Sequence, residues 1–236
     1  MNQSQRTIAV VVFPGVTSLD AVGPLTVFDR LPEPYRAVVV GTRTELLATD
    51  GALLLQPQRT LAEVPEPFAL LVAGGPGCVA AMADNAIQDY VRHSADTAEL
   101  VTSVCTGSLV LAAAGLLEGR RATTHWAYAA ELERLGAHYV RERWVEDGTF
   151  ITAAGISAGI DMALVLAARL TDIATARRIQ LSIEYDPQPP FGTLDWNEVG
   201  PSDLARQRQG GTGKELTRAS EIFADRPDLL RKLVAS

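Results

Sequence analysis

Short apolar runs, each stopped by Gly, Pro or Asp, alternate along most of the chain with stretches of helical periodicity. The runs are rich in Val and Leu and mostly lack alternating polar residues, which is typical of strands buried on both faces. The clearest runs are residues 8–13, 37–40, 53–55, 70–73 and 100–104. Helical patterns cover residues 20–31, 105–117, 126–135 and 160–170, and Asp172 is expected to cap a further helix that continues to Ile183. The alternation predicts a flavodoxin-like, doubly wound α/β fold with a mostly parallel sheet and helices on both faces.

Two regions depart from this alternation. Residues 137–152 contain two short extended runs separated by Asp147 and Gly148, which is a hairpin signal. After Tyr185 the chain becomes Pro-rich, and residues 201–236 read as helical. We therefore expect an α/β domain over residues 1–191 and a C-terminal helical extension over residues 192–236 that packs on the domain or on a dimer.

Charge and composition narrow the classes of function. The formal net charge is −7, and residues 201–236 carry seven Lys or Arg against five Asp or Glu, so no basic surface for nucleic acid is expected. The apolar run at residues 8–13 is too short to cross a membrane, and no small-residue cleavage site follows it. Two cysteines form no disulfide framework. A cytoplasmic protein with reduced thiols is the expectation.

The strongest candidate for a reactive side chain is Cys105. A buried run over residues 100–104 leads straight into a helical pattern, and the cysteine stands at the junction. Such an elbow exposes a nucleophile at the carboxyl edge of a sheet, and the N-terminus of the following helix stabilises a thiolate. The alternative is a small buried hydrophobic residue, which is the commonest role of a lone cysteine. The local pattern leaves both readings open.

Two further segments end strands at the same edge of the predicted sheet. Gly74 and Gly75 follow the run at residues 70–73, where glycines let backbone amides face a substrate, although a plain tight turn is the simpler interpretation. Asp20 closes the loop after the first run. It either caps the next helix or reaches the Cys105 thiol across the strand ends.

The remaining candidates are expected to be structural. Cys78 follows a Gly-Pro-Gly turn rather than a strand, and we expect it to be an incidental thiol. His125 is expected to cap a helix rather than to pair with a cysteine, while His93 is expected to be solvated and His138 structural. No residues have the spacing of a metal site, and no glycine-rich phosphate loop follows a strand, so neither a metal nor another cofactor is expected.

Three motifs together resemble a known family. The motifs are Ser-Val-Cys-Thr-Gly-Ser at residues 103–108, Leu-Leu-Glu-Gly-Arg-Arg-Ala-Thr-Thr-His-Trp at 116–126, and Ala-Gly-Ile-Ser-Ala-Gly-Ile-Asp at 154–161. They are similar to the ThiJ/PfpI superfamily of class I glutamine-amidotransferase-like proteins. The resemblance covers residues 8–191, and Asp20 with Thr106 is typical of the branch that hydrates isocyanides.

The resemblance implies a function and roles for particular residues. It implies a homodimer that uses no cofactor and hydrates isocyanides with water to N-substituted formamides through a thioimidate on Cys105. Asp20 matches the acid/base and Thr106 the neighbouring hydroxyl. Backbone amides at Gly74 and Gly75 are expected to polarise the adduct. Ala73, where the family usually has Pro, and Ala153, where more glycine is usual, are expected to reshape the pocket.

Two other functions within the same superfamily stay open from the sequence. Sensor domains of AraC-type regulators share much of the pattern, but they carry a helix-turn-helix tail of roughly a hundred residues that the short C-terminal extension does not supply. Glyoxalases, deglycases and stress-response chaperones of the superfamily generally have Glu where this chain has Asp20.

Overall fold

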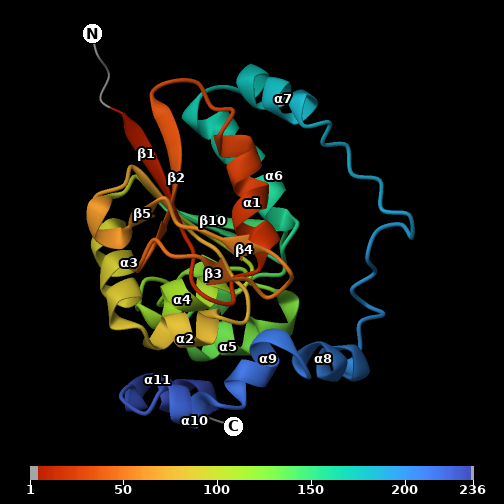
Figure 1. Cartoon of the computed structure of the whole chain (residues 1–236). Coiled ribbons are helices and arrows are strands. Elements are labelled where there is room, and N and C mark those ends of the chain that lie inside the picture. The colour runs from red at the N-terminus through yellow and green to blue at the C-terminus, as the bar shows by residue number, and fades with distance from the viewer. Residues whose placement is uncertain (1–4, 235–236) are drawn as a thin grey trace.

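The computed structural model describes residues 5–234 and is built around a seven-stranded sheet (Figure 1). The strands of this sheet are β1 (Arg6–Val11), β2 (Tyr35–Gly41), β5 (Arg59–Thr60), β6 (Ala69–Val72), β7 (Leu100–Val104), β10 (Trp144–Asp147) and β11 (Phe150–Ala153). Their order across the sheet is β10-β11-β7-β6-β1-β2-β5, and every neighbouring pair is parallel apart from β10 with β11. The five long parallel strands therefore follow the flavodoxin-like order 2-1-3-4-5, which confirms the predicted fold class.

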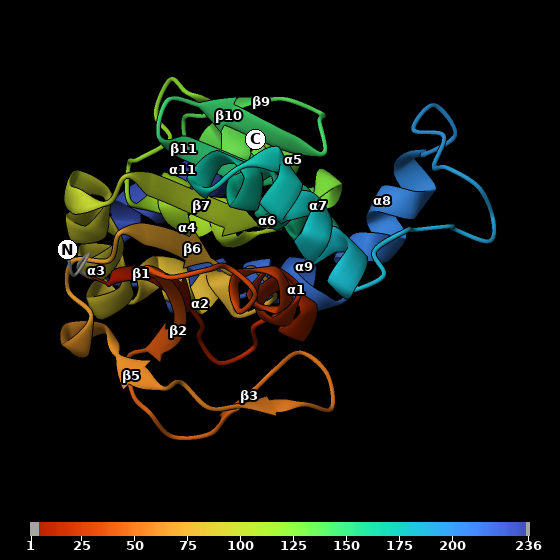
Figure 2. The same ribbon diagram turned by 90° about the horizontal axis from the view of Figure 1, so that it is seen from above.

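Helices cover both faces of the sheet. The helices are α1 (Ser18–Phe28), α2 (Cys78–Ala83), α3 (Asn85–Thr97), α4 (Gly107–Ala113), α5 (Ala129–Arg134), α6 (Ala158–Leu170), α7 (Ile173–Ser182), α8 (Pro201–Arg208), α9 (Gly211–Leu216), α10 (Ala219–Ile222) and α11 (Pro227–Val234), with short 3₁₀ turns η1 (Leu61–Glu63) and η2 (Trp126–Tyr128). Helices α1 and α6 pack together on one face, and α2, α3 and α4 pack together on the other (Figures 1 and 2). Strands β1, β6 and β7 lie between these layers and are almost entirely buried, which explains their continuous apolar sequences.

Two predicted strands differ in the structure. Residues 53–55 contribute β4 (Leu54–Leu55), which pairs antiparallel with β3 (Leu47–Ala48) in a separate two-stranded sheet. The predicted hairpin at Asp147 and Gly148 is confirmed as β10 and β11, with Gly148 at φ +66° in the turn. The earlier part of that region instead forms β9 (His138–Tyr139), which pairs with β8 (Arg121–Ala122). These runs are too short for sequence alone to assign their partners.

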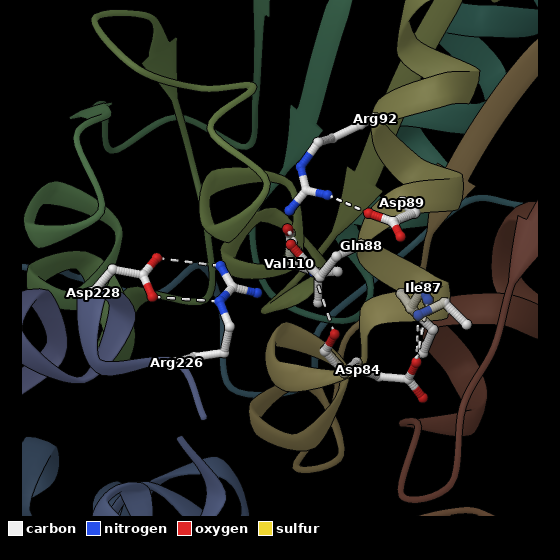
Figure 3. A network of polar contacts seen from close by, with 10 residues as sticks. Asp84, Ile87, Gln88, Asp89, Arg92, Val110, Arg226 and Asp228 are labelled. Carbon is white, nitrogen blue, oxygen red and sulfur yellow. Dashed lines mark hydrogen bonds and ion pairs between the residues drawn. The ribbon is translucent and has the colours of Figure 1, made fainter. Parts of the chain in front are cut away.

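One buried amide joins the three helices of the second face. Gln88 on α3 donates from Nε2 to the carbonyl oxygens of Ala81 (3.2 Å) and Val110 (3.4 Å), which lie on α2 and α4 (Figure 3). Because a buried amide without partners is costly, these two bonds favour one arrangement of the helices. The two bonds thereby hold α4, the helix that follows the Cys105 elbow, against α2 and α3.

The C-terminal residues return to the body of the protein after an exposed segment. This segment runs from the end of α7 to α8 and swings away from the sheet (Figure 1). Arg208 at the end of α8 donates hydrogen bonds from Nη2 and Nη1 to the carboxylate of the buried Glu131 of α5, at 2.5 and 3.1 Å. The hydroxyl of Tyr128 accepts a hydrogen bond from the backbone N–H of Gly213 at 2.9 Å. Helices α8 and α9 therefore hold η2 and α5, the elements that follow His125.

Candidate active site

The candidate site lies where the loops after β1, β6 and β7 meet. In the strand order, β1 and β6 are the neighbours at which successive connections leave in opposite directions, so their loops diverge at the carboxyl ends. The loop after β1 leads into α1 with Asp20, Gly74 follows β6, and Cys105 follows β7. The sequence order thus brings three of the predicted residues to one edge of the sheet.

Cys105 occupies a sharp turn between β7 and α4. Its φ is +56°, in the left-handed region that residues other than glycine rarely adopt. The backbone N–H of Cys105 donates to the carbonyl oxygens of Ala153 (3.1 Å) and Ala154 (2.8 Å), and the side chain is 4% exposed. This is the geometry of a nucleophile elbow, as predicted from the strand-to-helix junction.

Asp20 faces the thiol from α1. The N-cap of α1 is Thr17 and Asp20 is the third helical residue, so the capping interpretation of Asp20 is wrong. Its Oδ2 accepts a hydrogen bond from the Gly74 N–H at 3.0 Å, and its carboxyl group lies close enough to the Cys105 thiol for each group to act on the pKa of the other. Oδ1 is buried and has no partner among the described residues. The carboxyl group is therefore held next to the sulfur with one oxygen uncommitted.

Burial raises the pKa of Asp20 from 3.8 to about 7. Removal from water is the largest cause, because it disfavours the charged carboxylate. Hydrogen bonds from Gly74 and Cys105 oppose the rise in pKa, and the negative charge of Asp50 adds to it. An acid with this pKa both donates and accepts a proton near neutral pH.

Burial also raises the pKa of the Cys105 thiol well above its ordinary value, and the negative charge of Asp20 adds to the rise. The backbone N–H groups of Thr106 and Ile156 hydrogen-bond the sulfur and act in the opposite direction. The stabilising N–H groups expected at the helix N-terminus are thus present, but burial outweighs them. Because a charged Asp20 opposes the thiolate, the sulfur and the carboxyl group titrate as a coupled pair.

The amides of Gly74 and Gly75 are engaged within the protein. The Gly74 N–H binds Asp20, while the Gly75 N–H donates to the Thr106 hydroxyl at 2.8 Å. The same hydroxyl donates to the Gly75 carbonyl at 3.2 Å. These amides therefore have partners within the protein, and the backbone N–H groups that act on the Cys105 sulfur are those of Thr106 and Ile156.

Gly74 is glycine because three groups converge on it. A Cβ at this position would stand 2.6 Å from the Thr106 nitrogen and 2.7 Å from Asp20 Oδ2. Both separations are shorter than any van der Waals contact, so a side chain here would displace the acid or the elbow. The glycine pair identified in the sequence is thus required for packing at the site.

Cys78 and His125 lie near the site but are engaged elsewhere. Cys78 is the first residue of α2, is fully buried, and has its pKa raised to about 12 by that burial. His125 is the N-cap of η2, where Nδ1 accepts a hydrogen bond from Ala127 N at 3.3 Å, which confirms the predicted capping role. Burial lowers the pKa of His125, so its ring is neutral at neutral pH.

Two residues at the site had no signal in the sequence reasoning. Asp50 belongs to the loop after β3, and its Oδ2 accepts a hydrogen bond from the Thr17 hydroxyl at 2.6 Å. Ile156 lies inside the motif at residues 154–161, but only its backbone N–H reaches the sulfur. Neither contact has a motif of its own, because both depend on loops that are distant in sequence from Cys105.

Among residues 5–234, no group of three or more His, Cys, Asp or Glu residues is arranged to hold a metal ion. None of the helices described is long and apolar enough to cross a membrane.

Replacing Asp20 by asparagine is expected to change how stability depends on pH. Since the folded pKa of about 7 exceeds the ordinary 3.8, the proton on Asp20 stabilises the fold below about pH 4. This stabilisation is lost as the pH rises to 7, by on the order of 4 kcal/mol. Asparagine does not ionise, so Asp20→Asn should gain stability relative to the parent between pH 4 and pH 8. Urea unfolding of both proteins at the two pH values measures the gain, and an equal difference at both would contradict the burial of a protonated acid.

The chain is similar to a family model, to curated proteins and to solved structures. The model of the DJ-1/PfpI family matches residues 6–169. The isonitrile hydratase of Pseudomonas putida is 42% identical over 224 residues, which cover 94% of this chain and 98% of the hydratase. The HTH-type transcriptional regulator CdhR of Pseudomonas aeruginosa is 30% identical over 181 residues, which cover 75% of this chain but only 51% of the regulator. The crystal structure of a ThiJ/PfpI family protein from Pseudomonas syringae superposes with a TM-score of 0.82 at 30% identity, over 100% of this chain and 95% of that one.

Proposed function

The chain belongs to the DJ-1/PfpI family, and from this premise we propose that it hydrates isocyanides to N-substituted formamides with Cys105 as the nucleophile. The observation that carries the proposal is the buried Asp20 carboxyl group, held by Gly74 N–H beside the Cys105 elbow at the carboxyl edge of the sheet with one oxygen unpartnered. The similarity to an isonitrile hydratase over almost the full length of both chains supports the same activity.

The first half of the proposed reaction forms a covalent adduct. The terminal carbon of an isocyanide, R–N≡C, is electrophilic. The Cys105 thiol passes its proton to the Asp20 carboxylate, and the resulting thiolate attacks that carbon to form a sulfur–carbon bond. Asp20 delivers its proton to the same carbon, which gives the thioimidate R–N=CH–S–Cys105. A carboxyl group with a pKa of about 7 holds this proton at neutral pH, whereas an ordinary aspartate would not.

The second half releases the product with water. The Asp20 carboxylate, now charged, accepts a proton from the water that attacks the thioimidate carbon. The proton of the adduct's hydroxyl moves to the nitrogen, the sulfur–carbon bond breaks to release R–NH–CHO, and the proton on Asp20 returns to the Cys105 sulfur. The N–H groups of Thr106 and Ile156 hydrogen-bond the sulfur, so they stabilise the departing thiolate.

We propose a supporting role for the Thr106 side chain. Its hydroxyl bridges the N–H and the carbonyl of Gly75, so it fixes the turn that presents Gly74 to Asp20. Thr106 therefore contributes to the reaction in two ways. Its N–H lies beside the sulfur, and its hydroxyl holds the Gly75 turn that positions Asp20 through Gly74.

Purified protein is expected to convert an aryl isocyanide to the corresponding formamide, followed by absorbance. Several aryl and alkyl isocyanides should be compared, because Cys105 and Asp20 determine the reaction and not which R group the site accepts. A matched sample with methylglyoxal tests the glyoxalase alternative, and binding to duplex DNA at physiological salt tests the sensor alternative. Absence of isocyanide turnover together with consumption of methylglyoxal, or with DNA binding, would contradict the proposal.

We propose that the chain works as a homodimer. Leu19 and Val22 on α1 are 41% and 40% exposed, and Ile156 before α6 is 37% exposed, so large apolar side chains reach the surface beside the site. Burial of such side chains against a second copy would remove apolar surface from water. Light scattering at micromolar concentration should therefore report twice the monomer mass of 25.2 kDa, and a monomer would contradict the proposal.

We also propose the division of the chain and its compartment. The contacts of Arg208 and Gly213 with η2 and α5 support the assignment of residues 192–236 as an extension of the α/β domain over residues 1–191. Both cysteines are free, which supports the cytoplasm as the compartment.

A further inference from the structure

We propose that Thr124, supported by Ser108, is a positioning residue that aims the Thr106 N–H at the Cys105 sulfur by holding the carbonyl of the same peptide group. The catalytic meaning of this inference depends on the proposed function, but the arrangement itself does not. Neither hydroxyl touches the sulfur, and both act through the backbone of the elbow.

The contacts behind the elbow are direct. The carbonyl oxygen of Cys105 accepts one hydrogen bond from Thr124 Oγ1 and another from Ser108 Oγ, each at 3.1 Å. Both hydroxyl-bearing side chains are fully buried. Ser108 follows Cys105 by three residues and lies on α4, whereas Thr124 belongs to the separate segment between β8 and η2. The carbonyl is thus held from two elements with both of its lone pairs occupied.

Fixing the carbonyl of Cys105 also fixes the direction of the N–H in the same peptide group. The carbonyl of Cys105 and the N–H of Thr106 belong to one planar unit and point in opposite directions. The two hydroxyls fix the orientation of that plane, and the N–H at its other end lies beside the Cys105 sulfur, where it lowers the pKa of the thiol. Hydrogen bonds to a carbonyl also polarise the peptide and strengthen its N–H as a donor. Loss of either hydroxyl should therefore weaken stabilisation of the thiolate.

The strained backbone explains why such a hold is needed. Cys105 has φ +56°, which is unfavourable for a residue with a Cβ, so the surrounding contacts must maintain it. Its N–H is held by Ala153 and Ala154, and its carbonyl by Thr124 and Ser108. The segment that carries Thr124 is itself anchored, because the Thr123 N–H donates to Thr152 Oγ1 on β11 at 2.8 Å.

Thr123 provides a matched control. It is adjacent to Thr124, it is equally buried, and its own hydroxyl has no hydrogen-bond partner among the described residues. Thr123→Val and Thr124→Val remove the same atoms from neighbouring buried positions. Only the second removes a hydrogen bond to the elbow.

The test measures the rate of Cys105 alkylation by iodoacetamide as a function of pH, in a Cys78→Ala background. Thr124→Val should shift the profile upward by about one pH unit and slow alkylation at neutral pH about tenfold, whereas Thr123→Val should follow the parent. Thr124→Ser retains the hydroxyl and should restore the parent profile. The titratable groups that act on the thiol are Asp20 on α1 and Cys78 on α2, and the comparison leaves Asp20 unchanged and Cys78 absent throughout.

Two outcomes would overturn the proposal. The first is an identical profile for Thr124→Val and Thr123→Val, and the second is a Thr124→Ser profile that matches Thr124→Val. If Thr124→Val does not fold, Ser108→Ala removes the other hydroxyl, where an upward shift supports the proposal and an unchanged profile overturns it. Alkylation needs no isocyanide, so a parent protein without isocyanide turnover would refute the proposed function and leave this result intact.

Discussion

Cys105→Ala is expected to abolish isocyanide turnover, with a loss of roughly 10⁴-fold or more, because the covalent route requires the sulfur. Cys78→Ala should leave turnover within a few-fold of the parent. Cys78 is fully buried as the first residue of α2, whereas Cys105 stands at the left-handed turn after β7 with Asp20 beside it. Initial rates of formamide production by the two variants measure the difference.

Mass spectrometry after brief exposure to iodoacetamide gives an independent control. Cys105 should be labelled before Cys78, since its side chain retains 4% exposure and two backbone N–H groups hydrogen-bond its sulfur. Loss of turnover in Cys78→Ala, or earlier labelling of Cys78, would contradict the assignment of the nucleophile.

Asp20→Asn is expected to reduce turnover by about 10²–10⁴-fold, the usual contribution of a general acid/base, while the thiol still reacts with iodoacetamide. The amide fills the space of the carboxyl group but has no proton to transfer. Asp20→Glu keeps the proton but adds a methylene, which moves the carboxyl group from its place beside Gly74, so a loss of about 10²-fold is expected from misplacement. Turnover and alkylation rates, measured on the same samples, separate proton transfer from thiol reactivity.

Asp50 offers a matched control for charge. It is an exposed acid whose Oδ2 binds the Thr17 hydroxyl, and its negative charge makes only a small contribution to the raised pKa of Asp20. Asp50→Asn removes one carboxylate from the same loop cluster and should change turnover by no more than a few-fold. Full activity in Asp20→Asn, or an equal loss in Asp50→Asn, would contradict the specific role of Asp20.

The elbow was predictable because its signal is local. A buried run that ends in Val104 and continues as Cys-Thr-Gly-Ser leaves few conformations open, and the structure has strand, left-handed residue and helix in that order. The parallel strands β1, β2, β6 and β7 were predictable for the same reason, since each contains an apolar run of its own. The run at residues 53–55 was misassigned because so short a segment does not specify its partner.

Contacts between loops were beyond the reach of sequence reasoning. Whether Asp20 caps a helix or faces a thiol depends on where α1 begins, and a shift of a few residues separates the two interpretations. The position of Asp50 beside the site, and the engagement of the Gly75 amide by Thr106, depend on loops that meet only in the folded chain. Spacing along the sequence does not predict which side chains of two distant loops come into contact.

The left-handed backbone at Cys105 has a consequence for laboratory evolution of this chain. Glycine would adopt φ +56° without the steric penalty, which is of order 1 kcal/mol for a residue with a Cβ, and it would vacate a position that is otherwise buried. A selection for heat resistance alone would therefore tend to enrich replacements of the nucleophile itself, whenever the relief of strain exceeds the loss of packing. Libraries of this protein need turnover as a second criterion in every round. At residue 105, glycine suits the left-handed backbone best, whereas only cysteine supplies the thiol.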